Sequence, residues 1–316
     1  MNTSLSIPSS ASLGSAPTRP ATALVVAAFA AVYLVWGSTY LGMRLAIDSI
    51  PPLLMAGTRF MLAGGALYLV MSMRGAARPD LGHWGHATAS GALLLMAGNG
   101  GVVWAQQTMP SGVVALVVAS VPLWIMVVEW LRPHGRRPTA WVVLGLIIGL
   151  AGVVTIVMGR GSLGQRMAEP STAFILVGAN ICWAIGSIYS RHARKPDSAL
   201  LSVGMQMFCG GVLQFLLGVL LGEPARFDLA AITATSAWAF VYLTLIGSLV
   251  GYTAYIWLLQ VSTPSLVSTH AYVNPFVAVL LGWWFLHEPI PQSVIIAGAL
   301  ILSSVILITR FSSSPK

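Results

Sequence analysis

The chain has 316 residues, of which 57% are hydrophobic and only 8% carry a charge, and its mean hydropathy is +0.84. A soluble domain carries roughly 25% charged residues, so this composition excludes a soluble globular protein and indicates that most of the chain lies in lipid. The net charge of +8 falls in short basic clusters between apolar runs. That pattern is typical of cytoplasmic loops in membrane proteins and does not indicate nucleic-acid binding.

The chain begins with a segment rich in Ser, Ala and Pro, and then alternates apolar runs with short polar breaks. Residues 1–21 have no basic stretch before an apolar core, so they predict a disordered tail rather than a signal peptide. A membrane helix needs about 20 mostly apolar residues. Residues 311–316 form a short expected C-terminal tail. The ten expected spans are 22–44, 52–73, 87–108, 111–131, 139–159, 172–191, 198–221, 235–260, 264–286 and 292–310.

The basic residues predict the orientation of these spans. With the N-terminus in the cytoplasm, eleven Lys and Arg residues fall in cytoplasmic segments, four fall outside, and Arg59 is left within a span. The cytoplasmic set is Arg19, Arg74, Arg78, Arg132, Arg136, Arg137, Arg191, Arg194, Lys195, Arg310 and Lys316. The outer set is Arg44, Arg160, Arg166 and Arg226. Because cytoplasmic loops carry the excess of positive charge, both termini are expected inside.

Side chains that could bind a metal or form a disulfide are few and scattered. Cys182 and Cys209 lie inside apolar runs, and His83 and His86 flank Trp84 in an expected polar loop. Two histidines without further ligands do not define a metal site. The sequence also lacks a nucleotide-binding loop. No metal, no other cofactor and no direct use of ATP is expected.

The second part of the chain repeats the first. The stretches "YLVWGSTYLGMRLA" (33–46) and "ICWAIGSIYSRHA" (181–193) each place an arginine eight residues after a tryptophan. Matches of Trp, Gly and Pro are informative, because generic apolar helices do not share them by chance. An offset of 147 aligns Trp36 with Trp183, Arg44 with Arg191, Gly57 with Gly204 and Gly64 with Gly211. Further along, an offset of 153 aligns Gly98 with Gly251, Trp104 with Trp257, Pro122 with Pro275 and Gly145 with Gly298.

Each copy holds five expected spans, and an odd number reverses the direction of the second copy. The expected fold class is therefore an all-α polytopic membrane protein whose ten helices form a 5+5 inverted-topology repeat, with the copies at 22–160 and 170–310. Such repeats are typical of secondary transporters, in which one half rocks against the other around a central site. Arg44 is then expected at the outer rim and Arg191 at the inner rim.

Five stretches occur along the chain in this order: "VWGSTY", "AGTRF", "GNG", "PSGVVALVVASVPL" and "YVNPFVAVLLGWWFLHEP". On these motifs the chain resembles the EamA branch of the drug/metabolite transporter superfamily, over about residues 22–310. It implies a ten-helix export carrier of the bacterial inner membrane, with cytoplasmic termini and a central cavity between the halves. One departure is visible: Glu288 precedes Pro289 in the second half, whereas the first half has "LRPHGRRP", without an acid, at the matching place.

Polar and aromatic side chains within the spans are candidates for a substrate cavity, because polar groups in a membrane face protein or water. Trp36 and Trp183 either line a cavity or pack at helix interfaces. His270 could take up a proton, or could hydrogen-bond as a neutral ring between helices. The candidate cavity residues are Trp36, Tyr40, Arg59, Asn99, Trp183, Tyr189, Gln206, Tyr252, His270 and Asn274.

Arg59 is the arginine that the expected topology places deep in a span. It lies eight residues after Pro51, which at 1.5 Å per residue is roughly 12 Å into the membrane. One interpretation is that its guanidinium binds a substrate carboxylate through two parallel hydrogen bonds. The other is that it ties helix ends together through backbone carbonyls, or pairs with Asp48. Its match in the second half is Gln206, so the repeat is asymmetric at this position.

Two prolines at matching mid-span positions, Pro122 and Pro275, can kink or hinge their helices, because proline frees a backbone carbonyl. The gating candidates are Arg44, Pro122, Arg191 and Pro275.

No Asp or Glu falls near the expected bilayer midplane, and Glu129 is expected to pair with Arg132 on a helix surface. The lack of a buried mid-span carboxylate argues against a proton or sodium relay.

The sequence thus predicts a secondary transporter that exports a small organic metabolite by alternating access. An amino acid or another zwitterionic or hydrophobic compound fits, because phosphorylated cargo needs several basic groups and only Arg59 is deep. The alternative is a membrane-embedded enzyme or sensor without transport activity, but the sequence holds no paired aspartates or H-E-x-x-H helix. The expected partners are a small molecule and the lipid bilayer, without nucleic acid, and nothing in the sequence fixes the oligomeric state.

Overall fold

The computed structural model describes residues 22–132, 139–158, 170–262, 264–267 and 270–312, and every regular element within these ranges is a helix. The expected N-terminal tail and residues 313–316 lie outside the described residues, as do the "PHGRRP" segment (133–138) and the segment with Arg160 and Arg166. The helices, several of which continue directly into the next, are α1 (Thr22–Ala30), η1 (Ala31–Val35), α2 (Trp36–Ala46), α3 (Pro52–Met73), α4 (Leu81–Gly91), η2 (Ala92–Asn99), α5 (Gly100–Ala105), α6 (Ser111–Val118), α7 (Val121–Leu131), α8 (Ala140–Met158), α9 (Pro170–His192), α10 (Ala199–Leu220), η3 (Glu223–Arg226), η4 (Leu229–Ala231), α11 (Ala234–Tyr242), η5 (Leu243–Tyr252), α12 (Thr253–Val261), α13 (Pro264–Val267), α14 (His270–Leu286) and α15 (Gln292–Ser312).

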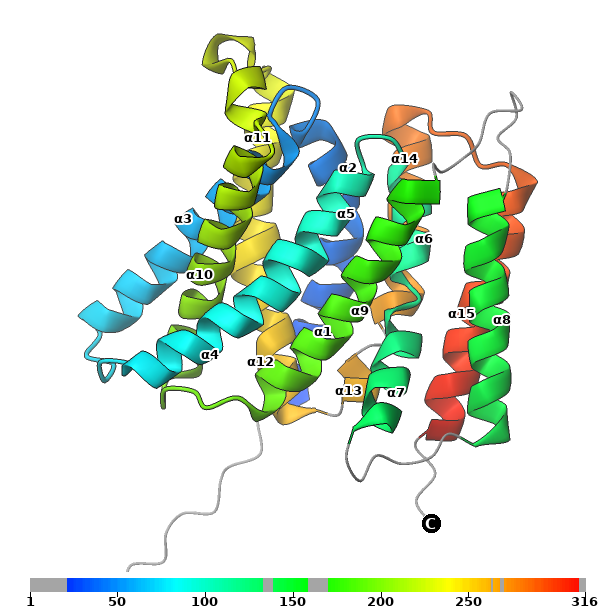
Figure 1. The fold of residues 1–316 in the computed structure, drawn as a ribbon, viewed down its shortest axis with the longest axis horizontal. Coiled ribbons are helices and arrows are strands. Elements are labelled where there is room, and N and C mark those ends of the chain that lie inside the picture. Colours follow the sequence, from blue (N-terminus) through cyan, green and yellow to red (C-terminus); the bar gives the residue numbers. More distant parts are fainter. Residues whose placement is uncertain (1–21, 133–138, 159–169, 263, 268–269, 313–316) are drawn as a thin grey trace, which may run out of the picture.

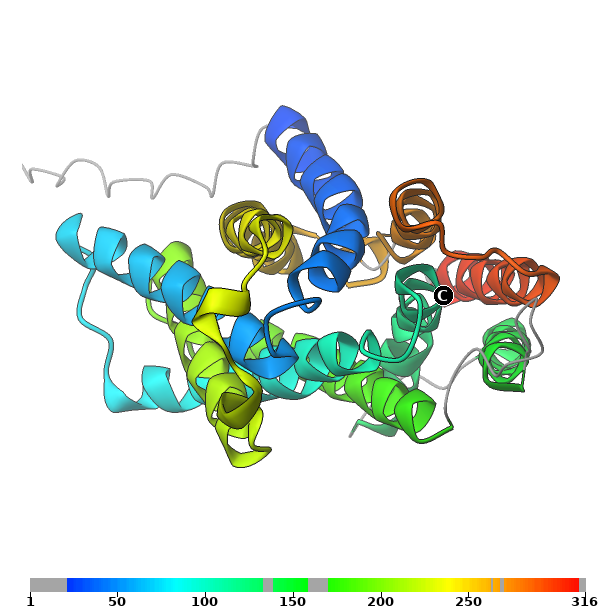
Figure 2. The ribbon, with the colours of Figure 1, turned by 90° about the horizontal axis from the view of Figure 1, so that it is seen from above.

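The helical segments stand side by side, with their connections gathered at two opposite ends (Figure 1). Seen along the bundle, α8 and α15 pack together at one side and α3 with α10 at the other (Figure 2). Within the described part of the chain, six segments are long and apolar enough to cross a membrane: Thr22–Ala46, Pro52–Met73, Ser111–Leu131, Pro170–His192, Ala199–Leu220 and Ala234–Val261. Shorter apolar helices are Ala140–Thr155, Val273–Leu286 and Gln292–Ile308. The predicted all-α class with apolar spans is confirmed at this level.

The third segment begins earlier than the sequence predicts. Helix α4 starts at Leu81 because Asp80 caps it: the Asp80 carboxylate accepts from the His83 N–H at 2.8 Å, and the His83 ring accepts from the Asp80 N–H at 3.2 Å. This reciprocal capping box places both histidines on a helix, so the predicted polar loop around His83 and His86 is wrong. The His86 ring hydrogen-bonds to the Tyr189 hydroxyl at 2.6 Å.

Helices α3 and α10 cross at close range through glycines that the repeat aligns. A Cβ atom on Gly64 would lie 2.7 Å from the Gly204 carbonyl oxygen, and one on Gly211 would lie 2.8 Å from the Gly57 carbonyl oxygen. Real Cβ atoms essentially never come that close, so only glycine lets the two backbones meet here. Small residues of this kind allow tight helix association in lipid. The two matched glycine pairs therefore build a single helix crossing.

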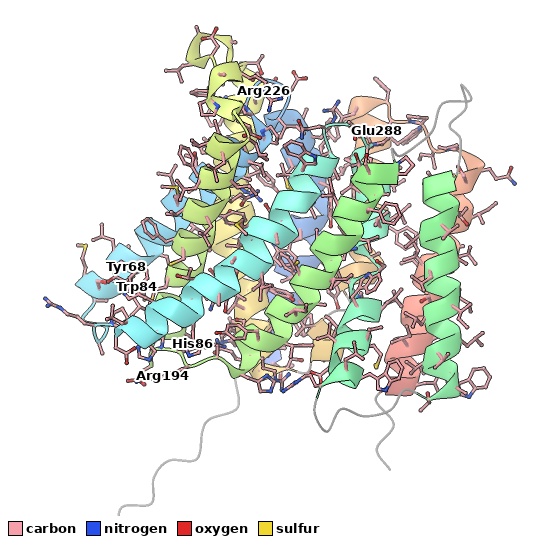
Figure 3. The ribbon with its side chains drawn as sticks, in the orientation of Figure 1. Tyr68, Trp84, His86, Arg194, Arg226 and Glu288 are labelled. Carbon is pink, nitrogen blue, oxygen red and sulfur yellow. The ribbon has the colours of Figure 1, made fainter. Side chains whose placement is uncertain are left out.

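Two carboxylates tie connecting segments to helix starts at one end of the bundle. Glu223 is fully buried and accepts from two N–H groups in the first turn of α3, at 3.1 and 2.8 Å. Glu288 accepts from two N–H groups in the first turn of α6, at 2.9 and 3.3 Å. These N–H groups have no partner within their own helix, and a negative charge is stabilised beside them. Figure 3 places Glu288 and Arg226 at this end, opposite His86 and Arg194.

Replacing Glu223 by Ala is expected to destabilise the fold by roughly 1–3 kcal/mol, because two buried N–H groups lose their acceptor. The matched control is Glu129→Ala. Glu129 pairs with Arg132 at 3.2 Å on the surface, as the sequence predicts, and its loss should cost about 0.5 kcal/mol or less. Thermal unfolding in detergent measures both variants. Equal midpoints would contradict the proposed role of the buried cap.

Candidate functional site: an internal cavity

A cavity lies within the bundle, between segments that are distant in the sequence. Its volume of about 80 Å³ is room for roughly five to eight water molecules at about 10–15 Å³ each, which suits a compact solute. Segments on both sides of residue 160 contribute to its wall. Of the candidate cavity residues, those that line it are Trp36, Tyr40, Arg59, Asn99, Trp183, Tyr252, His270 and Asn274.

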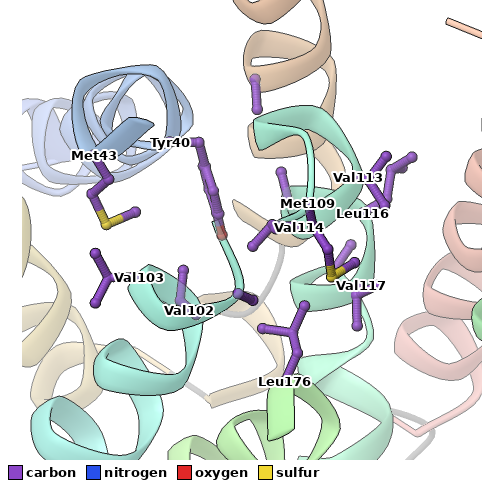
Figure 4. Close-up of a cluster of buried hydrophobic side chains, with 14 of the residues drawn as sticks. Tyr40, Met43, Val102, Val103, Met109, Val113, Val114, Leu116, Val117 and Leu176 are labelled. Carbon is purple, nitrogen blue, oxygen red and sulfur yellow. The ribbon is translucent and has the colours of Figure 1, made fainter. Parts of the chain in front are cut away.

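The first segment presents one helical face to the cavity. Trp36, Thr39, Tyr40 and Met43 recur at intervals of three or four residues, and all four line the wall. Tyr40 and Met43 belong at the same time to a buried hydrophobic cluster that includes Leu176 (Figure 4). This packing fixes the wall of the cavity on that side.

Trp36 and Trp183 meet at the cavity wall, with ring centroids 5.6 Å apart and an interplanar angle of 80°. Each also packs against a glycine of the other half. A Cβ on Gly251 would lie 2.7 Å from Cδ1 of Trp36, and a Cβ on Gly98 would lie 2.9 Å from Cε3 of Trp183. Because the repeat aligns both the tryptophans and the glycines, the two contacts are equivalent. The tryptophans therefore both line the cavity and pack between helices.

Arg59 is a buried cation on the cavity wall, with 3% of its surface exposed. Its Nη2 donates to the Asn99 side-chain oxygen at 3.1 Å and lies 3.9 Å from the Met43 sulfur. Its Nε has no hydrogen-bond partner, and none of the ion pairs among the described residues includes Arg59. Neither a helix-end carbonyl nor Asp48 holds it in the described structure.

The matched residues of the second half make an equivalent hydrogen bond. The Tyr252 hydroxyl donates to Gln206 at 3.4 Å, as Arg59 donates to Asn99. The Gln206 amide also bonds two serine hydroxyls, at 3.3 and 3.2 Å, and does not line the cavity. The positive charge is therefore on one side of the cavity only.

Two stretches of π-helix lie beside these residues. Segments η2 and η5 end at Asn99 and Tyr252, which the 153-residue offset aligns. A π-helical turn widens the backbone spiral and rotates the following side chains, and such turns are frequent at functional sites. Apolar composition gives no signal for them, so the sequence does not predict either segment.

Tyr189, like Gln206, is a candidate that the structure places away from the cavity. It follows Trp183 by six residues, which is about 240° around a helix. It therefore points away from the face that carries Trp183. Its hydroxyl contacts His86, which Figure 3 places at the opposite end of the bundle from Glu288.

Three of the four gating candidates lie at or near helix ends, and the fourth lies inside a helix. Arg44 and Glu288 line a separate hollow at one end of the bundle, and Arg191 is exposed in the last turn of α9. Pro122 follows a break between α6 and α7, so it starts a helix instead of kinking one. Pro275 lies inside α14.

Asn180 also lines the cavity and is not among the residues that the sequence predicts there. Its amide donates to the Val117 carbonyl at 2.9 Å and to the Ser120 hydroxyl at 3.2 Å, at the break that precedes Pro122. The sequence feature that could have marked Asn180 as a cavity residue is its position inside an apolar run, three residues before Trp183.

Apolar helices around an internal cavity with a buried arginine on its wall fit the architecture of a membrane transporter. The chain belongs to the EamA-like transporter family, which matches residues 22–158 and 170–310. The resemblance that the sequence motifs predict is thereby confirmed.

Several individual proteins are similar over almost the whole chain. The inner membrane transporter YedA of Escherichia coli K12 is 36% identical over 281 residues, which is 88% of each protein. Protein PecM of Dickeya dadantii is 28% identical, over 88% of this chain and 90% of that one. A probable terminal-alkyne amino-acid exporter of Streptantibioticus cattleyicolor is 24% identical, over 87% and 90%. A solved crystal structure, 19% identical, shares the fold with a TM-score of 0.63 over 92% of this chain and 99% of that one.

Proposed function

We propose that this chain is a secondary transporter that exports a small organic metabolite across the bacterial inner membrane by alternating access. The observation that carries the proposal is the central cavity, built from matched residues of both halves with the buried Arg59 on its wall. Membership of a transporter family and the name of YedA, an inner membrane transporter, support it. The cargo is an amino acid or another zwitterionic or hydrophobic compound, in keeping with a small cavity and with the exporter name of one relative.

The proposed architecture is ten spans in two inverted five-helix repeats, 22–160 and 170–310, with both termini in the cytoplasm. Three features support it: the glycine crossing of α3 with α10, the reciprocal tryptophan–glycine contacts, and the π-helical segments at matching positions. In this arrangement the cavity residues bind the cargo, while Arg44 and Arg191 rim opposite ends and the two prolines permit gating.

Counterflow tests the function. Purified protein in liposomes loaded with an unlabelled solute should accumulate the same labelled solute transiently, for at least one member of a panel of amino acids and aromatic compounds. Empty liposomes are the control. A panel without any counterflow would contradict transport and favour an enzyme or sensor.

A fluorescent protein fused after Lys316 is expected to fluoresce, and alkaline phosphatase fused there is expected to be inactive. The reason is that eleven basic residues fall in the proposed cytoplasmic segments and four outside. Active phosphatase with a dark fluorescent fusion would overturn the proposed orientation.

Replacing Pro122 or Pro275 by Ala is expected to slow counterflow several-fold with little loss of folded protein. Alanine restores a backbone N–H and lets α6 run on into α7, or straightens α14. Yield and elution profile in detergent are the control for folding. Unchanged transport in the double variant would leave both prolines as static features.

A further inference from the structure

The cavity carries a positive charge that nothing in the described structure neutralises. Arg59 is 97% buried, has no carboxylate partner and leaves Nε without a hydrogen bond. Its guanidinium lies 4.4 Å from the centre of the Phe60 ring, and the one hydrogen bond that it makes to an oxygen of the described residues goes to a neutral amide. A buried charge is expensive to maintain without an ionic partner, so the site is incomplete until an anion arrives.

The rest of the wall offers no second charge. The described residues that line the cavity include no aspartate, glutamate or lysine. The His270 ring donates from Nδ1 to the Val267 carbonyl at 2.8 Å and makes T-shaped contacts with the rings of Trp36 and Tyr255. An ammonium group on the cargo would therefore enter beside Arg59 without a carboxylate to receive it.

Five aromatic side chains form part of the neutral wall. Trp36, Tyr40, Phe60, Trp183 and Tyr252 all line it. The indole N–H groups are already used: Trp36 donates to a backbone carbonyl at 3.4 Å and Trp183 to a tyrosine hydroxyl at 3.1 Å. Rings whose polar atoms are engaged elsewhere present apolar surface, which favours an aromatic or similarly apolar body.

We propose that the cargo is a compact aromatic monocarboxylate that moves as an anion, without a compensating ion. This inference rests on the proposed transport function and, among small organic solutes, selects an aromatic anion over a zwitterion such as an amino acid. Its carboxylate binds the guanidinium of Arg59 through paired hydrogen bonds, and its ring packs on the aromatic wall. Each exported molecule then carries one negative charge outward. A potential of 100 mV, negative inside, favours that movement by about 50-fold, at about 2.3 kcal/mol per charge. The membrane potential thus supplies the driving force for export.

The test compares three solutes that share a ring and differ in charge: phenylacetate, phenylalanine and phenethylamine. Purified protein in liposomes is adsorbed to a solid-supported membrane, and each solute is applied as a concentration jump at constant pH. Only phenylacetate is expected to produce a protein-dependent current, in the direction of a moving anion and at least tenfold above the other two. Passive entry of the uncharged acid carries no current, and empty liposomes measure any remaining background.

Two variants sharpen the comparison. Arg59→Gln is expected to remove the current, and Arg226→Gln, which deletes an equal charge at an exposed site outside the cavity, is expected to keep it. Phenylalanine counterflow that equals or exceeds that of phenylacetate, without current, would overturn the anion proposal but leave the transport function intact. A phenylacetate current that persists in Arg59→Gln would also overturn it. If no solute of the wider panel shows counterflow, the transport function itself fails.

Discussion

Arg59→Gln is expected to abolish counterflow while the protein still inserts into the membrane and stays monodisperse in detergent. Glutamine is the residue at the matching position of the second half, where Gln206 is buried and hydrogen-bonded, so an amide is expected to be accommodated at position 59. What disappears is the buried positive charge. Hydrogen bonds to a charged group contribute about 1.5–3 kcal/mol, so the expected loss of cargo binding is roughly 10- to 100-fold.

Arg59→Lys separates charge from shape. An ammonium keeps the positive charge but lacks the planar fork that binds a carboxylate through two parallel bonds, so partial activity is expected. Counterflow rates measured beside size-exclusion profiles decide between the two interpretations of Arg59. Aggregation of Arg59→Gln would favour a purely structural role, whereas normal transport by this variant would contradict both interpretations.

Gly64→Ala is expected to impair folding strongly, whereas Gly65→Ala, at the next residue, is expected to be tolerated. A Cβ on Gly64 would meet the Gly204 carbonyl oxygen at 2.7 Å and a Met207 side-chain carbon at 2.8 Å. A Cβ on Gly65 would meet only ring atoms of Phe208, at 3.6 and 3.8 Å, which is ordinary contact. Overpacking typically costs about 1–3 kcal/mol, and a rigid backbone partner puts Gly64 at the upper end.

Membrane yield and thermal unfolding in detergent compare the two glycine variants. Both substitutions replace glycine by alanine in α3. The difference between their unfolding midpoints therefore reports only the crossing of α3 with α10. Similar unfolding midpoints for both variants would contradict the close approach at Gly64. Gly204→Ala provides a second measurement from the opposite helix, because a Cβ there would lie 2.8 Å from the Tyr68 backbone nitrogen.

Much of the fold was predictable because strong local signals mark where helices start. The span predicted at 52–73 coincides with α3, which begins directly after Pro51, and the spans near 198 and 292 are correct to within two residues at either end. The sequence predicts the third span from residue 87, later than its start at Leu81, because the low hydropathy of the stretch around His83 outweighs the capping signal of Asp80. The matched glycines were recognisable as a repeat, but their meeting in one crossing depends on three-dimensional packing.

The site was predictable where helical periodicity applies. Trp36 and Tyr40 are four residues apart and share a face, so both line the cavity, whereas Tyr189 is on a different face from Trp183. The sequence does not assign Asn180 to the cavity, because a single polar residue in an apolar run can face either a cavity or any of several neighbouring helices. The sequence separation of Arg59 and Asp48 allows an ion pair between them. Only the three-dimensional packing shows that this pair does not form.

The central claim is that one cavity between two halves opens alternately to either side of the membrane, and thiol accessibility tests it most directly. Val118 lines the cavity and is partly buried, so Val118→Cys places a reporter there in a background without Cys182 and Cys209. A membrane-impermeant maleimide is expected to label this cysteine both in intact cells and in inside-out vesicles, and a transported solute should slow both reactions. Labelling from one side alone, unchanged by every solute of the panel, would contradict alternating access.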